Sequence, residues 1–324
     1  MSERYPDKTG VAILGGGITG LATAYFASRE GLPVSVFEKK GRLGGNCITY
    51  RHGDFSFDSG AHRIHDKNPV VTALSQSLIG DDLLRIDIPS QVYDGGHLLK
   101  FPFSFRNLFF HLGPTNIIRA GLEILHENFA KTEKQTFEHS AKRRYGSTVA
   151  QRFLLNYTEK LWGLPCDQLS PELSGGRLKG LDMRRVMSEI LGMRSHRRDM
   201  EGAFYYPRMG IGTLAERFIA GSIGARFQID SEIEAVYNDG RRVTGVRTRN
   251  GEEIEVDHLI STIPLPSLLR ALDPPIPDTI FTASQSLRYR NLILVAYYFS
   301  SDYVAWLAHV IHGFNIAFLH IGNM

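Results

Sequence analysis

The sequence predicts an α/β fold made of a strand–helix–strand domain and an inserted, largely helical domain. Three observations support this prediction. Residues 11–38 contain an apolar run, a glycine-rich turn, a helical pattern and a second apolar run that ends in an acid. Residues 66–205 place apolar side chains three and four positions apart, the period of an amphipathic helix. Residues 227–263 alternate apolar and polar side chains, the period of half-buried strands.

The first predicted element is a buried strand over 11–14 that leads into a GxGxxG turn. Gly15 permits the tight turn, Gly17 lets backbone N–H groups approach a pyrophosphate, and Gly20 lets a helix pack on the sheet. That helix, predicted over 21–30, carries partial positive charge for phosphates at its N-terminus. The cofactor-binding candidates of the turn are Gly15, Gly17, Ile18, Thr19 and Gly20.

The second predicted strand, 34–37, ends in Glu38, whose carboxylate can accept hydrogen bonds from an adenosine ribose. An ordinary glycine-rich turn is the alternative interpretation, but the order strand, turn, helix, strand and acid favours a dinucleotide site. A second glycine loop follows at once. Its adjacent Gly44 and Gly45 let the backbone pass close to a ligand, and Arg42 offers a cation to phosphate.

The residues after this loop carry a family resemblance. Residues 57–65 read Phe-Asp-Ser-Gly-Ala-His-Arg-Ile-His. With the two glycine loops, this segment resembles the FAD-binding half of the superfamily of amine oxidases, protoporphyrinogen oxidases and UDP-galactopyranose mutases. The resemblance implies a Rossmann-like FAD-binding domain of the glutathione-reductase type, in which flavin N5, and no side chain, carries the chemistry. It adds as cofactor-binding candidates Lys39, Arg42, Gly44, Gly45, Asn46, Gly60, Ala61, His62 and, through backbone beside the adenine, Val236.

The changes in pattern predict discontinuous domains. The FAD-binding domain comprises residues 1–65 and 206–285, the helical substrate domain residues 66–205, and a truncated or atypical C-terminal segment residues 286–324. Within the helical domain, the periodicity predicts helices over 74–79, 116–129 and 147–161, with turns at Asp81-Asp82 and Gly95-Gly96 between them.

The alternating region predicts a β-meander. Its strands are expected at 227–229, 233–237, 243–247 and 254–256, with hairpin turns at 238–240 and 250–251, and a buried strand at 259–263 meets a loop. In the superfamily, such a meander and strand return the chain to the FAD-binding domain. An independent β-meander is the alternative.

Composition narrows the function classes. The 37 Lys and Arg against 34 Asp and Glu give a net charge of +3, which makes no case for nucleic acid as the main partner. Two cysteines imply no disulfide framework and fit a reducing compartment, so we expect a cytoplasmic protein. Cys47, beside the second glycine loop, is either a reactive thiol or a small packing residue. No metal-ligand spacing and no Ser-His-Asp set stands out.

The middle of the chain resembles UDP-galactopyranose mutases in particular. Those enzymes have a Gly-Ala-His-x-x-His segment, matched at 60–65, a Tyr-Thr-x-Lys-x-Trp-Gly segment, matched at 157–163, and an arginine shortly after. By this resemblance, Arg177 contacts a substrate diphosphate and Trp162 lies beside a nucleotide-sugar. Residues 169–172 and 177–181 are more similar to protoporphyrinogen-oxidase-like FAD oxidoreductases. The substrate-binding candidates are Tyr157, Trp162, Arg177 and His65.

Three of the candidate site residues, Trp162, Arg177 and His62, also have a purely structural interpretation. Trp162 could be a core anchor, because buried aromatic side chains usually pack against other side chains. Arg177 belongs to a run of basic residues, and such runs usually form a solvated face. His62 as a satisfied core histidine is the alternative to a flavin neighbour, which the adjoining Gly60 and Ala61 favour.

The C-terminal residues depart from the superfamily pattern. Residues 303–321 are nearly uncharged and read as a marginal membrane span, or as the product of truncation or an altered reading frame. We expect this apolar segment to allow peripheral association with membranes. Two function classes remain open. One is a flavoenzyme, an oxidoreductase or a mutase-like isomerase, acting on an anionic nucleotide-sugar or an apolar small molecule. The other is a truncated, catalytically inactive FAD-binding remnant.

Overall fold

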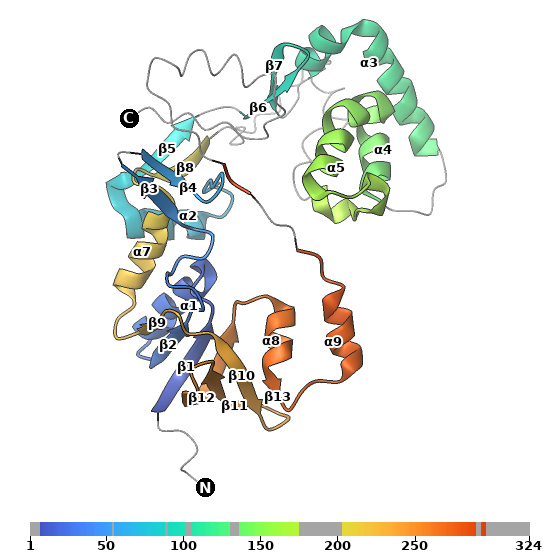
Figure 1. Cartoon of the computed structure of the whole chain (residues 1–324). Helices are drawn as coiled ribbons and strands as arrows, with labels where there is room; N and C mark the ends of the chain where they lie inside the picture. The colour runs from blue at the N-terminus through green and yellow to red at the C-terminus, as the bar shows by residue number, and fades with distance from the viewer. Residues whose placement is uncertain are drawn as a thin grey trace. The chain divides into compact units, whose positions relative to one another are not determined.

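The computed structural model describes residues 7–53, 55–87, 90–101, 105–129, 136–174, 203–289 and 293–295. Figure 1 labels the helices and strands within these ranges. The chain divides into two compact units, and each is described by itself. The first comprises Met1–Ile86 with Phe204–Met324, and the second comprises Asp87–Ala203. Arg177 and residues 303–321 lie outside the described residues.

The first unit is built on a mixed sheet of seven described strands, in the order β13-β10-β11-β12-β1-β2-β9. Central β1 pairs in parallel with both β2 and β12, and β9 pairs in parallel with β2. The pairs β10–β11 and β11–β12 are antiparallel. The strands are β1 Asp7–Leu14, β2 Val34–Phe37, β9 Arg226–Gln228, β10 Ile233–Asn238, β11 Val243–Thr248, β12 Glu253–Ser261 and β13 Leu272–Asp273.

Apolar side chains pack on both faces of this sheet, which explains the continuous apolar runs in β1 and β2. On one face, Ile13 and Val36 pack with Ala24 of helix α1. On the other face, Leu14 and Phe37 join a cluster that Leu268 of α8 extends. The helices of this unit are α1 Ile18–Arg29, α2 Pro69–Ile79, α7 Gly212–Gly221, α8 Leu265–Ala271 and α9 Asp278–Gln285, with a 3₁₀ turn at Gly80–Asp82.

Two further strand pairs are separate from the seven-stranded sheet of the first unit. Strands β3 Thr49–His52 and β4 Phe55–Asp58 form an antiparallel hairpin. Strand β5 Leu83–Asp87 pairs with β8 Ala203–Pro207. Neither pair was predicted from the sequence.

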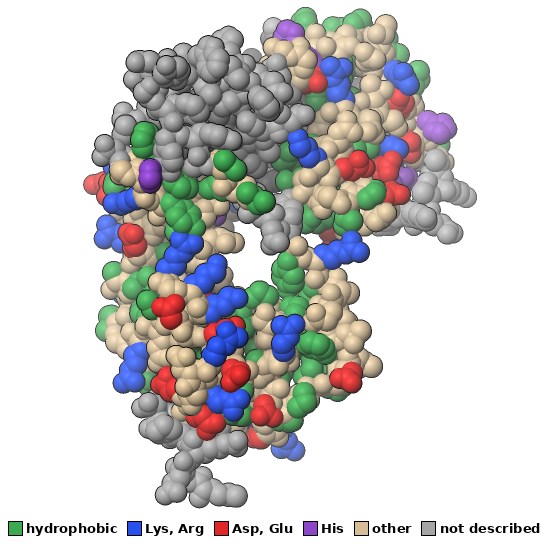
Figure 2. All heavy atoms as spheres, viewed as in Figure 1, with side chains coloured by type: hydrophobic (Ala, Val, Ile, Leu, Met, Phe, Trp, Pro, Cys, Tyr) green, Lys and Arg blue, Asp and Glu red, His purple; other side chains and the backbone are tan. Residues whose placement is uncertain are grey.

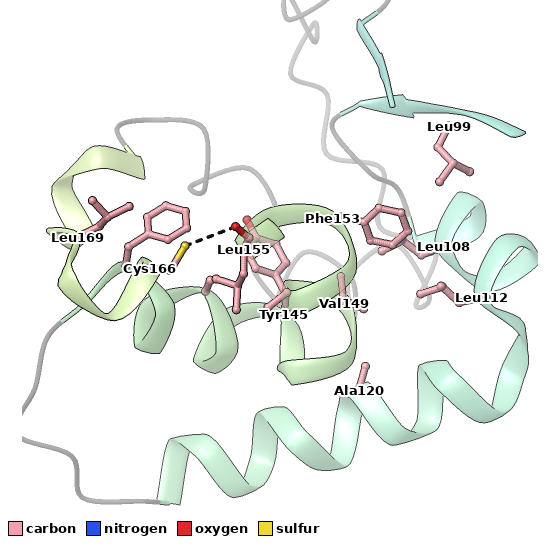
Figure 3. Close-up of a cluster of buried hydrophobic side chains, with 13 residues drawn as sticks. Leu99, Leu108, Leu112, Ala120, Tyr145, Val149, Phe153, Leu155, Cys166 and Leu169 are labelled. Atoms are coloured by element: carbon pink, nitrogen blue, oxygen red, sulfur yellow. Dashed lines mark hydrogen bonds between the residues drawn. The ribbon is translucent and has the colours of Figure 1, made fainter. Parts of the chain in front are cut away.

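The second unit is mainly helical, and its described residues surround one core (Figure 3). Its elements are β6 Ser90–Asp94, β7 His97–Phe101, α3 Phe105–Phe129, α4 Phe137–Ala150, a π-helical turn Gln151–Leu155, α5 Asn156–Trp162 and 3₁₀ turns Cys166–Gln168 and Pro171–Ser174. Helix α4 bends at Gly146, where φ is 76°. A Cβ there would lie 2.6 Å from the carbonyl oxygen of Ala120, so α3 and α4 approach closely only because this residue is glycine.

Most predicted elements are present, but several segments differ from the prediction. The segment predicted at 227–229 is β9, which pairs in parallel with β2 and lies outside the meander. The segments predicted at 254–256 and 259–263 form the single strand β12 up to Ser261. The Gly95-Gly96 turn connects two strands, β6 and β7, within a region predicted to be helical.

The division into units also differs from the predicted domain boundary at residue 66. Helix α2 packs on α7 of the first unit, because Leu74 and Leu78 contact the cluster that contains Phe218. The second unit therefore starts at Asp87. Among the described residues, no helix is both long enough and apolar enough to cross a membrane.

Candidate functional site: two glycine loops at the carboxyl end of the sheet

The first glycine turn follows β1 at the carboxyl end of the parallel strands. Gly15 has φ of 100°, and its N–H donates to the Phe37 carbonyl oxygen over 2.9 Å. A Cβ on Gly20 would lie 2.0 Å from the carbonyl oxygen of Gly15. The protein's own backbone therefore requires glycine at both positions, as the sequence predicted. In open α/β sheets, this edge is where ligands bind.

Gly17 differs from these two glycines. Its φ of −75° is open to any residue, and a Cβ there would meet only the Cα of Gly45, at an ordinary 3.8 Å. Nothing in the described protein therefore demands glycine at this position. An empty space beside backbone at a helix N-terminus is what a bound phosphate requires. Gly17 fits a cofactor pyrophosphate on this observation.

The second glycine loop contacts the first directly. The Gly44 N–H donates to the Gly16 carbonyl oxygen over 2.7 Å, and Gly17 and Gly44 form a parallel bridge. Gly45 has φ of 60°, and a Cβ there would lie 2.8 Å from the Cα of Gly17. The two predicted cofactor loops thus form one backbone surface, with Asn46 exposed next to it.

Glu38 connects this surface to the end of β2. Its carboxylate is 9% exposed, and its two oxygens accept N–H groups from Gly16 (2.8 Å) and Lys40 (2.9 Å). Each carboxylate oxygen has a second acceptor site, so the predicted ribose bonds remain available. These bonds hold the glycine turn in place, a role of Glu38 that the sequence did not indicate. Lys39 is exposed beside it.

Helix α1 begins at the glycine turn without a side-chain cap. Gly17 is its N-cap residue, and its first turn contains no acidic residue. The N–H groups in the first turn of a helix have no partner within the helix and attract anions. The helix terminus is therefore suited to a phosphate.

Arg42, predicted as a phosphate contact, packs against Tyr50 of the β3–β4 hairpin. Its Nη2 donates to the Tyr50 hydroxyl over 2.6 Å, and its guanidinium lies 4.8 Å from the Tyr50 ring centroid. Tyr50 in turn stacks on Phe57, with centroids 5.4 Å apart. The exposed cation is therefore held in a defined position beside the second glycine loop.

Asp58, at the end of β4, joins three segments and was not predicted. It accepts hydrogen bonds from Thr49 Oγ1 (2.6 Å), Tyr206 Oη (2.5 Å) and the Ile211 N–H (3.2 Å). Burial and the nearby Asp58 carboxylate raise the pKa of Tyr206 above its usual range. These bonds fix the hairpin to the start of α7.

Cys47 lies near the same carboxylate. Burial, and then the Asp58 charge, raise the pKa of its thiol. Because the thiolate is the nucleophilic form, this environment favours the packing interpretation over the reactive one.

The segment that follows Asp58 carries the predicted flavin neighbours. Ser59 Oγ hydrogen-bonds to the Asn46 carbonyl oxygen and lies 3.3 Å from His62 Nε2. Gly60 is half-buried and accepts the His62 N–H over 3.0 Å, and Ala61 is exposed. His62 is half-buried, so it is not a core histidine. The exposed His65 ring lies 6.5 Å from that of Phe204.

The remaining predicted residues lie apart from the glycine loops in sequence. The Val236 side chain is fully buried in the sheet core, so only its backbone could contact a ligand. Tyr157 and Trp162 are on α5 of the second unit and are 45% and 39% exposed. The exposure of Trp162 does not fit the core-anchor alternative. On the face of the first unit drawn in Figure 2, Lys and Arg side chains are interspersed with Asp and Glu.

Comparisons with known proteins also point to a flavin-binding family. A sequence model of the family described as flavin-containing amine oxidoreductase matches residues 18–320. A phytoene desaturase of Phycomyces blakesleeanus is 25% identical over 304 residues, which cover 85% of this chain and 51% of that protein. A UDP-galactopyranose mutase of Mycoplasma pneumoniae is 25% identical over 186 residues, covering 52% and 44%.

A solved structure shows the same fold. The crystal structure of reduced UDP-galactopyranose mutase superposes with a TM-score of 0.71 at 22% identity, covering 87% of this chain and 62% of that one. The chain spans about half the length of the curated relatives it matches.

Proposed function

The chain belongs to the flavin-containing amine oxidoreductase family, and from this membership and the paired glycine loops we propose that it acts as an FAD-dependent oxidoreductase on a small molecule. The membership confirms FAD as the cofactor predicted from the sequence. The oxidoreductase activity of this chain and its substrate are the proposal.

The observation that carries this proposal is the difference between Gly17 and its neighbours. Gly15 and Gly20 are explained by the protein's own backbone, whereas no described atom requires glycine at position 17, and a group bound in the adjoining space would. That space adjoins the N-terminus of α1 and the Gly44–Gly45 backbone. An anionic group with backbone N–H partners fits it, as the pyrophosphate of FAD would.

In this proposal the chain's residues bind and orient, and the cofactor supplies hydride or electron transfer once bound. The first turn of α1 and the second glycine loop hold the diphosphate. Glu38 keeps the glycine turn in place and accepts ribose hydroxyls at its remaining acceptor sites. Asp58 fixes the segment that bears His62.

The test is the Gly17→Ala substitution. The added methyl fits the free protein, with its closest contact at 3.8 Å, so the unfolding temperature should stay close to that of the parent. FAD affinity should fall by about tenfold or more, a loss of at least roughly 1.4 kcal/mol, because the methyl occupies the phosphate space. Gly121→Ala is the matched control, since a Cβ there meets no atom within 4 Å and lies on α3, away from the glycine loops in sequence.

Flavin absorbance of the purified proteins and calorimetric titration with FAD give the readout. Equal FAD affinity for Gly17→Ala and Gly121→Ala would contradict the proposed site. A folded parent chain that binds FAD but turns over no substrate would favour the catalytically inactive alternative.

A second candidate is mutase-like action on a nucleotide-sugar, favoured by the exposure of Tyr157 and Trp162 on α5. Aromatic side chains with this much exposed surface are available to stack on a base or a sugar. UDP titration should quench the fluorescence of Trp162 in a Trp306→Phe background, which leaves one tryptophan. If UDP gives no quenching and no calorimetric signal, the mutase candidate is excluded and the redox one stays.

A further inference from the structure

The turn that carries His62 is fixed to its surroundings by several hydrogen bonds. Asp58, which begins it, binds Thr49, Tyr206 and the Ile211 N–H. The Ser59 N–H donates to the Ile48 carbonyl oxygen over 3.0 Å, and the His62 N–H closes the turn on Gly60. The backbone beneath the His62 ring therefore has a defined position.

The hydroxyl of Ser59 connects this turn to the second glycine loop. Its Oγ hydrogen-bonds to the carbonyl oxygen of Asn46 and also lies 3.3 Å from His62 Nε2. A serine hydroxyl has one proton to donate, and a carbonyl oxygen can only accept. The Ser59 proton is therefore committed to Asn46, and a lone pair of Oγ faces the imidazole.

From this geometry we propose that Ser59 is a positioning residue that holds neutral His62 in its Nε2–H tautomer. Only a ring N–H can complete a hydrogen bond to the remaining lone pair of Ser59. In neutral imidazole, one nitrogen carries the proton and the other accepts. Nδ1 is then the nitrogen left as acceptor, and the bond made at Nε2 decides this.

The consequence for function rests on the proposed FAD site. The relay of hydrogen bonds starts at Asn46, in the loop whose Gly44 N–H binds Gly16. It ends at Nε2 of His62 and thereby decides which ring nitrogen carries the proton of the neutral imidazole. If His62 lies beside the flavin, as the family resemblance implies, Nδ1 is the ring nitrogen left to accept a hydrogen bond from the cofactor.

The experiment is a long-range ¹H–¹⁵N NMR spectrum of the imidazole groups in the full chain without added FAD. His62→Gln identifies the His62 signals among the 12 histidines. At a pH at which the imidazole is neutral, the parent should show the ¹⁵N shift of a protonated nitrogen for Nε2 and that of an unprotonated nitrogen for Nδ1. Ser59→Ala should lower the ratio of the Nε2–H to the Nδ1–H tautomer by roughly 2- to 12-fold, the factor that one hydrogen bond supplies.

Ser59→Thr keeps the hydroxyl and should restore the parent ratio, which separates the hydrogen bond from a general packing effect. A parent spectrum with the proton on Nδ1 would overturn the proposal even if Ser59→Ala fails to fold. Equal ratios in the parent and a folded Ser59→Ala variant would overturn it as well.

Addition of FAD tests the second half separately. If Nδ1 meets the flavin, its ¹⁵N shift should move on binding while Nε2 stays protonated. Bound FAD that leaves the Nδ1 shift unchanged overturns the flavin contact. A chain that binds no FAD, yet shows the expected tautomer and Ser59→Ala effect, retains the positioning role while the proposed function fails.

Discussion

Replacement of Glu38 by glutamine separates two roles that the sequence could not distinguish. If Glu38 served only a bound ribose, the change would weaken FAD binding and leave the free protein unaffected. In the structure, both carboxylate oxygens already accept backbone N–H groups, from Gly16 at 2.8 Å and Lys40 at 2.9 Å. Glutamine can accept only one of them and turns an NH₂ donor toward the other.

The expected cost follows from these contacts. A hydrogen bond to a charged acceptor contributes about 1.5–3 kcal/mol, and the site is 9% exposed, so water compensates little for its loss. We expect Glu38→Gln to destabilise the cofactor-free protein by about 2–3 kcal/mol. At roughly 2–4 °C per kcal/mol, the unfolding temperature falls by about 4–12 °C.

Thermal unfolding of the cofactor-free chain, followed by circular dichroism, measures this change. Hydrogen exchange adds a local readout, because the Gly16 and Lys40 amides should lose protection in the variant. Glu30→Gln is the matched control, as Glu30 is an exposed residue at the end of α1 and should leave both readouts unchanged. Identical unfolding temperatures for the two variants would refute a structural role for Glu38.

Further predictions concern two glycines, a buried tyrosine and an arginine elsewhere in the chain. Gly146→Ala should destabilise the chain by about 2–4 kcal/mol, because it forces φ of 76° on a residue with a Cβ and places that Cβ 2.6 Å from the Ala120 carbonyl oxygen. Urea unfolding should show a smaller loss, about 1–2 kcal/mol, for Gly163→Ala, where φ is 66° but the space is open. Burial raises the pKa of Tyr145 to about 12, above its unfolded value of about 10. Its contribution to stability is then complete below pH 10 and lost as the pH rises through 12, so Tyr145→Phe should flatten the decline in unfolding free energy over that interval. If the mutase candidate holds, Arg177→Ala should weaken calorimetric UDP binding by about 10- to 150-fold, the loss of one charge-assisted hydrogen bond of roughly 1.5–3 kcal/mol.

The strand–helix–strand unit could be predicted because its signals are local. Gly15, Gly20 and the apolar runs on either side act on their immediate neighbours, so sequence order alone specifies the turn, the helix and β2. The hairpin turns at 238–240 and 250–251 could be predicted for the same reason, and the antiparallel pairs β10–β11 and β11–β12 confirm them.

Strand partners could not be predicted in this way. The alternation at 227–229 indicates a strand but does not encode its neighbour, and β9 pairs in parallel with β2 rather than with the next strand in sequence. The β6–β7 hairpin was missed because its strands are short and lie within a helical pattern, although the Gly95-Gly96 turn was recognised.

The site was predictable where glycines marked it and not where side chains from distant segments meet. Asp58 binds Thr49, nine residues away, and Tyr206, 148 residues away. Its position directly before Ser59-Gly60 was the only signal, and it indicates no partner. The relay from Asn46 through Ser59 to His62 likewise depends on how the loops meet in the folded chain.

The most direct test of the central claim is hydrogen exchange of the full chain with and without FAD. FAD should slow exchange of the backbone amides at the start of α1, from Ile18 to Gly20, and in the Gly44–Asn46 loop. The exchange rates of the amides in α3 and α4, which belong to the second unit, should change little on addition of FAD, so these amides serve as the internal reference. Protection that appears elsewhere while both glycine loops exchange as in the free chain, or no FAD-dependent protection at all, would contradict the assignment of these loops as the cofactor site.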